Sequence, residues 1–197
     1  IRTLRRARLP LSYSQGYHPH PKVAFESARP VAEESLASYM DIVLKERIDP
    51  QQVLFKLQQV VANGFRVLSV KEVPLKAPAL MSQIDGMDYL FYVPVPKSEL
   101  EVKIQTLLNK DSLPIQRKKK QRNKRRRQKS EFRTIDMRPH IASLDPTIPV
   151  GWEERNGWSG FQASLNRIEN RGMRPSELLG LLGIEIEQSR VIRLKTK

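Results

Sequence analysis

One run of thirteen residues, 117–129, cannot enter a hydrophobic core and therefore limits how this chain can fold. Its sequence, RKKKQRNKRRRQK, contains ten lysines and arginines, with no acid and no apolar side chain. Like charges at this density repel one another and bury nothing, so we expect the run to project from the folded body as a loop or arm. Its ten charges supply most of the formal net charge of +14 and leave +4 for the rest of the chain.

A concentrated positive field of this kind indicates a polyanionic partner. Lysine and arginine side chains that face phosphates release condensed counterions, which gives a salt-dependent affinity independent of base sequence. We expect nucleic acid, with a membrane surface and a solvated loop without a partner as the alternatives. The run does not name the nucleic acid. The predicted phosphate-binding residues of the run are Arg117, Lys118, Lys119, Lys120, Arg122, Lys124, Arg125, Arg126, Arg127 and Lys129.

Length and composition set further bounds. The 197 residues, 39% of them hydrophobic, suit one large domain or two domains of about 100 residues. With no cysteine, the chain offers no disulfide, no thiolate zinc site and no ligands for an iron–sulfur cluster. No metal site and no bound cofactor are predicted. No apolar stretch approaches the roughly 20 residues that cross a bilayer, so we expect a cytoplasmic protein without membrane contact.

Hydrophobic periodicity predicts alternating helices and strands. Asp49 and Pro50 are a typical helix start before an apolar stripe that stops at Asn63. In the first half we expect helices at 1–8 and 50–62 and strands at 22–26, 38–44 and 65–73. In the second half we expect helices from Ser98, with Glu101 completing a capping box, and at 175–182, and strands at 89–95, 113–117, 132–138, 161–165 and 186–194.

This order predicts an α+β protein of two ferredoxin-like (split β-α-β) units in tandem. The first unit, residues 1–76, lacks its opening strand, because the chain begins inside a helix and without a methionine, as a fragment would. Residues 77–86 form a connector. The second unit, residues 87–197, carries the basic insertion 117–129. The halves share no residue-level repeat, so the duplication is predicted from the order of elements alone.

A proline-rich segment, residues 9–22, contains the second group of candidate site residues. Three prolines and a glycine exclude a helix, and the segment mixes aromatic rings, an amide, imidazoles and a cation. This mixture suits single-stranded nucleic acid, whose bases stack on aromatic rings. A stiff loop packed over the sheet is the competing interpretation. The candidates are Tyr13, Gln15, Gly16, Tyr17, His18, His20 and Lys22.

His18 and His20 flank a proline, and side chains two residues apart project to one side of an extended backbone. Two such imidazoles suit acid–base chemistry on a ribose phosphate, or a metal with a further ligand. The simpler interpretation is that they hydrogen-bond the loop or contact a ligand passively. They are the only candidates for catalysis.

Residues 9–25 (LPLSYSQGYHPHPKVAF), with YMDIV at 39–43, VPLKAP at 73–78 and TIDMRP at 134–139, resemble a bacterial family of radical-SAM-linked domains of unknown function. That family occurs as a separate protein or fused behind a cobalamin-binding radical SAM enzyme. The resemblance implies work with RNA beside such an enzyme, which would use a 4Fe–4S cluster, S-adenosylmethionine and cobalamin. It supplies no catalytic residue, and this chain lacks the three-cysteine cluster motif.

The function expected is therefore that of a non-catalytic accessory domain, which binds RNA or presents a substrate for a radical SAM enzyme. Two alternatives stay open. One is a metal-independent RNA-processing enzyme that uses His18 or His20 as acid or base. The other is a protein-docking module whose basic arm meets an acidic partner.

Overall fold

The computed structural model describes residues 1–27, 33–118, 131–149, 157–169 and 171–197. The chain divides into two compact units, one of residues 1–28 and 39–83, the other of residues 29–38 and 84–197. The final crossing between them, after Gln83, falls inside the connector predicted at 77–86. Of the basic run, only Arg117 and Lys118 are among the described residues, so the predictions for Lys119 to Lys129 lie outside them.

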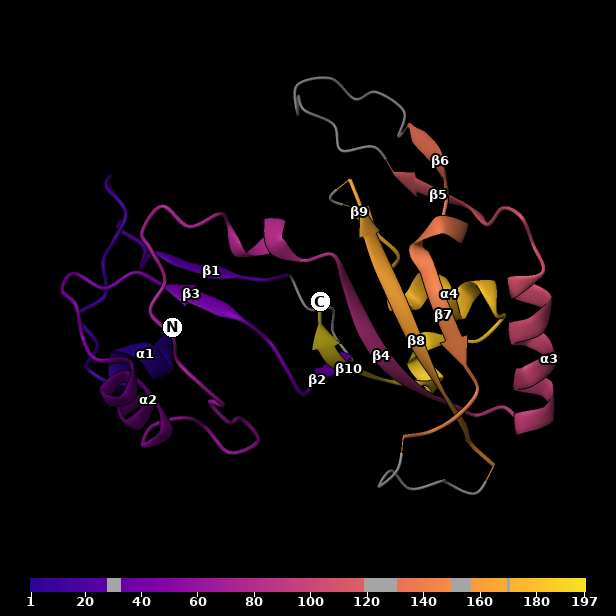
Figure 1. The fold of residues 1–197 in the computed structure, drawn as a ribbon, viewed down its shortest axis with the longest axis horizontal. Coiled ribbons are helices and arrows are strands. Elements are labelled where there is room, and N and C mark those ends of the chain that lie inside the picture. The colour runs from indigo at the N-terminus through magenta and orange to yellow at the C-terminus, as the bar shows by residue number, and fades with distance from the viewer. Residues whose placement is uncertain (28–32, 119–130, 150–156, 170) are drawn as a thin grey trace. The chain divides into compact units, whose positions relative to one another are not determined.

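The second unit is built on a mixed sheet with the strand order β2-β10-β4-β8-β7 (Figure 1). Neighbouring strands are antiparallel except for β2, which pairs with β10 in parallel. A short strand, β9, pairs with the end of β8. The strands are β2 (Glu33–Ser35), β4 (Gly86–Val93), β7 (Ile141–Asp145), β8 (Ser159–Ile168), β9 (Arg171–Gly172) and β10 (Arg190–Thr196).

Alternation along the strands separates two apolar faces of this sheet. Helices α3 (Lys97–Leu108) and α4 (Pro175–Leu181) pack on the face that presents Phe91 and Phe161, whose rings stack 4.7 Å apart. The opposite face presents a smaller cluster, against which Trp158 packs. The helix-covered face holds the main core of the unit, which includes Leu100, Ile104, Leu107, Leu178, Leu179 and Leu182.

The predictions for α3, α4 and the strand after them are confirmed in part. The capping box predicted from Ser98 and Glu101 is wrong, because α3 begins at Lys97 after Pro96 and makes no side-chain cap. Helix α4 lies where it was expected, and Gly183 follows it with φ +68°, a left-handed conformation that suits glycine. The predicted strand 186–194 is a 3-10 turn, η3 (Ile186–Gln188), followed by β10.

A two-stranded antiparallel ribbon stands apart from the main sheet (Figure 1). It consists of β5 (Pro114–Lys118) and β6 (Phe132–Asp136), with Lys118 opposite Phe132 at the end that joins the basic run. Strands were expected at 113–117 and 132–138, and both form, but they pair with each other and lie outside the main sheet. Strand β7, which the sequence did not predict, occupies the edge of that sheet. Strand β7 has a register shift between Ile141 and Ser143, which hides the period-two pattern.

The first unit is smaller and packs two helices against a short strand pair. Helix α1 (Arg2–Arg6) and helix α2 (Pro50–Gln58) lie on an apolar cluster with β1 (Val23–Phe25) and β3 (Met40–Ile42), and η1 (Leu80–Gln83) ends the unit. The predicted helix start is confirmed, since the Asp49 carboxylate accepts from the backbone N–H groups of Gln51 at 3.0 Å and Gln52 at 3.2 Å. No described helix has the length and apolar character needed to cross a membrane.

The strand predicted at 65–73 is wrong. Residues 66–73 form no strand, because their N–H and C=O groups make no hydrogen bond to another backbone group in the structure as described. Val67 and Val70 pack on the cluster of the first unit, whereas Phe65 and Leu68 are exposed. The sequence has the alternation of a strand, but a strand also requires a neighbour to pair with its N–H and C=O groups.

Candidate nucleic-acid interface

Positive charge is unevenly divided between the two units. The first unit contains eleven lysines and arginines against five acids, a net charge of +6. The second contains 24 against 16, a net charge of +8, of which the basic run supplies ten. Without the run, the second unit would carry −2. The cationic features of the protein are therefore the body of the first unit and the run that the second unit carries on its ribbon.

Residues 12–22 of the first unit form a narrow hairpin, here called the Tyr17 hairpin. At its base, the Lys22 N–H donates to the Ser12 carbonyl at 2.8 Å. Two further bonds tie this base to the residue after β3, since the Ser12 N–H donates to the Val43 carbonyl at 2.8 Å and the Val43 N–H donates to the Lys22 carbonyl at 3.0 Å. Nearer the tip, the Ser14 N–H donates to the His20 carbonyl at 2.8 Å, and the His20 N–H donates to the Ser14 Oγ at 3.0 Å. The segment is thus a hydrogen-bonded hairpin despite its two prolines.

The hairpin projects most of the predicted binding residues into solvent. Tyr17 at its tip is fully exposed, and Gly16 before it has φ +123°, a conformation that a side chain at this position would strain. Tyr13 differs, because it is half-buried and packs on the apolar cluster of the first unit. The exposed candidates are Gln15, Gly16, Tyr17, His18, His20 and Lys22.

The two hairpin histidines have no side-chain partner among the described residues. No hydrogen bond or ion pair reaches either imidazole, so nothing orients a general acid or base there. Within the described part of the chain, no group of three or more His, Cys, Asp or Glu side chains gathers as metal ligands do. His140, the third histidine, is buried in the second unit, with its Nδ1 3.2 Å from the Asn166 carbonyl.

Helix α1 adds a second cationic feature to the first unit. Leu4 and Ala7 are buried in the apolar cluster, and the arginines occupy the exposed side. Their guanidinium groups enlarge the positive surface of this unit without an acidic partner among the residues described. These arginines are Arg2, Arg5 and Arg6 of α1, and Arg8, which follows the end of the helix.

Arg117, the first residue of the basic run, is held inside the second unit. Its Nε donates to Glu177 Oε1 at 2.7 Å, and its Nη2 donates to Glu177 Oε2 at 2.5 Å and to the Gly172 carbonyl at 2.7 Å. The two side chains are 14% and 12% exposed. Arg117 therefore does not fit its predicted role as a phosphate contact, because Glu177 neutralises its charge within the fold.

The Arg117–Glu177 pair fixes the end of the ribbon at which the basic run begins, here called the foot of the ribbon. Glu177 also accepts from the Arg174 N–H at 2.8 Å, so one carboxylate joins the ribbon to the start of α4. Burial alone raises the pKa of Glu177, but the hydrogen bonds from Arg117 and Arg174 outweigh it, and the pKa lies below its usual value. Sequence analysis missed Glu177, because no local pattern links residues 60 positions apart.

Asp136 at the other end of the ribbon also plays a structural part. The Asp136 carboxylate accepts hydrogen bonds from two backbone N–H groups, those of Leu113 at 2.7 Å and Arg138 at 2.9 Å. The Arg138 and Leu113 bonds lower the pKa of Asp136. The carboxylate thereby closes the end of the ribbon opposite the basic run.

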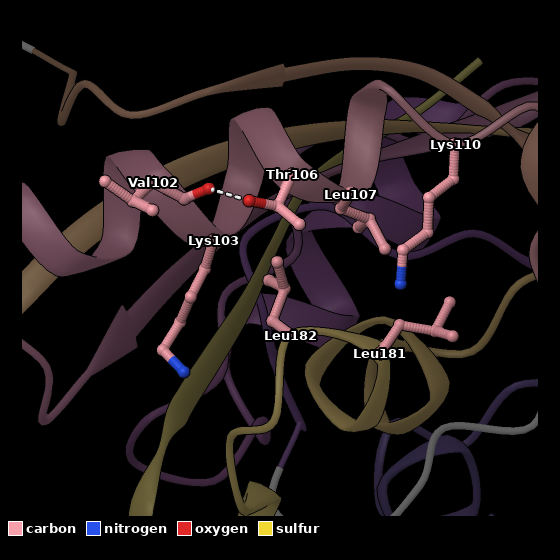
Figure 2. A pocket seen from close by; sticks show the side chains of 7 residues that line it. All are labelled: Val102, Lys103, Thr106, Leu107, Lys110, Leu181 and Leu182. Carbon is pink, nitrogen blue, oxygen red and sulfur yellow. Dashed lines mark hydrogen bonds between the residues drawn. The ribbon is translucent and has the colours of Figure 1, made fainter.

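A shallow hollow of about 150 Å³ lies between α3 and the end of α4 (Figure 2). Its walls are mainly aliphatic, and the Thr106 hydroxyl is occupied by a 2.8 Å bond to the Val102 carbonyl. Small-molecule sites usually have about 300–1,000 Å³ and several convergent polar groups. This hollow has neither. It is lined by Val102, Lys103, Thr106, Leu107, Lys110, Leu181 and Leu182.

Comparison with known proteins gives one match. Residues 1–175 match the model of a family described as uncharacterized proteins conserved in bacteria, DUF2344. The chain belongs to this family. No curated protein and no solved structure matches the chain. The part of the resemblance that concerns a bacterial domain of unknown function is therefore confirmed, and DUF2344 membership assigns no activity, ligand or partner.

Proposed function

We propose that this DUF2344 domain is a cytoplasmic accessory domain that binds RNA and presents it to a catalytic neighbour. The observation that carries the proposal is that the basic run is flanked by two paired strands anchored to the body of the second unit. Its flanking strands form a ribbon whose foot is locked to the body by Arg117 and Glu177. A cationic segment held on such a foot neutralises phosphates at a fixed place on the protein.

The Tyr17 hairpin supplies a second kind of contact. Its tip carries an aromatic ring in full solvent on a base tied by backbone hydrogen bonds. Unpaired bases stack on such rings, and Lys22 with the arginines of α1 offers cations for the neighbouring phosphates. On this proposal the basic run gathers RNA through its backbone, and the Tyr17 hairpin contacts bases.

The proposed neighbour is a radical SAM enzyme, and this part rests on the sequence resemblance. A radical SAM enzyme uses a 4Fe–4S cluster and S-adenosylmethionine, and members of the resembled group also have a cobalamin-binding region. The residues of this chain do not fit such a cluster, because the sequence has no cysteine. We therefore assign no catalytic step to the chain.

We further propose that the second unit is a ferredoxin-like sandwich. The antiparallel order β10-β4-β8-β7, with α3 after β4 and α4 after β8, supports this topology, to which β2 and the β5–β6 ribbon are additions. An experimental structure with another strand order would contradict it.

The decisive experiment removes the basic run and keeps the foot of the ribbon. Residues 119–131 are replaced by Asn-Gly, a two-residue hairpin turn, so that Lys118 and Phe132 still pair. The replacement removes eight cations. Binding of a fluorescein-labelled structured RNA is measured over a salt series. Each lost phosphate contact lowers the slope of log K against log salt by about 0.7–0.9, so the loss of four contacts changes it by about 3.

A matched control tests whether charge or length matters. A second variant keeps all thirteen positions and replaces the same eight cations by glutamine or serine. In both variants the slope of log K against log salt should fall by the same amount. If both bind as the unchanged protein does, the run does not contact phosphates and the proposal fails. If RNA binding is absent throughout while an acidic protein partner still binds after nuclease treatment, the docking alternative replaces it. RNA cleavage lost in His18→Ala and His20→Ala would favour the enzyme alternative.

A further inference from the structure

The β5–β6 ribbon has two chemically different faces. Ile115 and Ile135 point to one face and pack against the core of the second unit, and Arg117 lies on the same face. The other face is exposed along its whole length. Alternation and the strand register place on it Pro114, Gln116, Lys118, Phe132, Thr134 and Asp136.

Phe132 is a large apolar residue that this face of the ribbon leaves exposed to solvent. Its side chain is 58% exposed, and it does not belong to the apolar clusters of the described residues. A phenylalanine here gains little from burial, although an aromatic ring is a large apolar surface that folding usually removes from water. Lys118 lies directly opposite it across the ribbon. An exposed ring therefore stands next to a cation where the ribbon meets the basic run.

We propose that this exposed face is a stacking platform for an unpaired base of RNA. The Phe132 ring receives the face of the base, and the Lys118 ammonium contacts an adjoining phosphate. Gln116 and Thr134, the next pair along the same face, offer hydrogen bonds to the base or sugar. This inference rests on the RNA-binding function proposed above and names the substrate class as single-stranded RNA.

Charge and geometry favour a single strand over other occupants. The occupant must be anionic, because Lys118 belongs to the platform and eight further cations follow it in the sequence of the basic run. It must also offer a flat apolar surface, which an unpaired base does and a continuous duplex, with its bases stacked inside, does not. The ribbon is preorganised by the Arg117–Glu177 pair at 2.7 Å and by cross-strand pairing, so little ordering opposes binding there.

Salt dependence separates stacking from phosphate contact in one titration. Fluorescence anisotropy follows an unstructured RNA of about 12 nucleotides, and a duplex of equal length, over a salt series. Phe132→Ala should weaken binding of the single strand roughly tenfold, leave duplex binding unchanged and leave the salt slope unchanged, because no charge is lost. Lys118→Gln should lower the slope by about 0.7. Phe132→Tyr keeps the ring and should bind as the unchanged protein does.

Phe55→Ala is the matched control, since Phe55 is 64% exposed on α2 of the first unit and should not alter binding. Equal affinity of Phe132→Ala and the unchanged protein for the single strand would overturn the platform and leave the basic run's role standing. The platform would also be overturned if Phe132→Ala weakened the binding of single strand and duplex equally. The same holds if Phe132→Ala weakened the binding of polyglutamate, an anionic polymer without bases, as much as that of the single strand. Failure of the unchanged protein to bind any RNA would reject both this inference and the proposed function.

Discussion

Glu177→Gln tests the structural foundation of the proposed interface. The substitution keeps the size of the side chain and removes its charge. Arg117 then loses the carboxylate that accepts two of its N–H groups, and it retains the Gly172 carbonyl at 2.7 Å. The start of α4 also loses a charged acceptor for the Arg174 N–H.

The magnitude follows from burial. Loss of one partner from a buried ion pair costs about 3–5 kcal/mol, because the remaining charge stays buried without compensation. Here the side chains are 14% and 12% exposed, and glutamine still presents an oxygen to Arg117. We therefore expect the free energy of unfolding of the second unit to fall by about 2–3 kcal/mol.

The pH dependence has a definite sign. The folded pKa of Glu177 is lowered, since its hydrogen bonds to Arg117 and Arg174 outweigh the effect of burial. The stabilisation is therefore complete above the unfolded pKa of about 4.3 and is lost as the pH falls through the folded pKa. The difference in unfolding free energy between the unchanged protein and Glu177→Gln should be constant at neutral pH and should shrink below about pH 4.

Urea unfolding followed by tryptophan fluorescence measures this effect, because both tryptophans belong to the second unit. The control is Glu99→Gln, which removes the exposed pair with Lys103 at 3.4 Å and should cost less than about 0.5 kcal/mol. A cost for Glu177→Gln no larger than that of the control would refute the reasoning. So would a difference that grows as the medium becomes more acidic.

Three further predictions concern other parts of the fold. Glu33→Ala breaks the Glu33–Arg193 pair, whose side chains are 5% and 2% exposed, and should lower the free energy of unfolding by about 3 kcal/mol. The Leu36 amide, which donates to the Arg193 carbonyl at 2.9 Å, should then exchange its hydrogen faster. Asp49→Ala removes the cap of α2 and should cost about 1 kcal/mol, seen as faster exchange of the α2 amides and not of the α3 amides. Gly183→Ala places a side chain at φ +68° and should lower the unfolding free energy by about 1 kcal/mol in the urea assay, with no change if that conformation is unstrained.

Elements with local signals were predictable from the sequence. Asp49, Pro50 and the apolar stripe after them specify the start of α2 within a few residues of chain. Pro175 and Gly183 bracket α4 in the same way. Strand β4 contains a continuous apolar run, Tyr89 to Val93, which is buried on both faces of the sheet. In each case the residues that signal the element lie within one turn or one side-chain repeat of one another, so the signal can be read from a short stretch of sequence.

Elements that depend on a distant neighbour were not predictable. Strand β2 contains Glu33 and Glu34, and β10 supplies both its pairing edge and its arginine partners, Arg193 and Arg190. The register shift of β7 disguises its pattern. Residues 66–73 show the opposite case, in which a strand-like sequence lacks backbone pairing in the described structure.

The candidate interface likewise has features set by local sequence and features set by contacts between residues far apart in the chain. Sequence alone determined that ten cations stand together in residues 117–129 and that Tyr17 follows a glycine in a proline-rich segment, because charge density and backbone restriction are properties of the local chain. Only the tertiary structure decided that Arg117 serves the fold, since its partner Glu177 lies 60 residues away. It alone also decided which face of the ribbon exposes Phe132, because strand register and packing against the core, and not sequence spacing, set that direction.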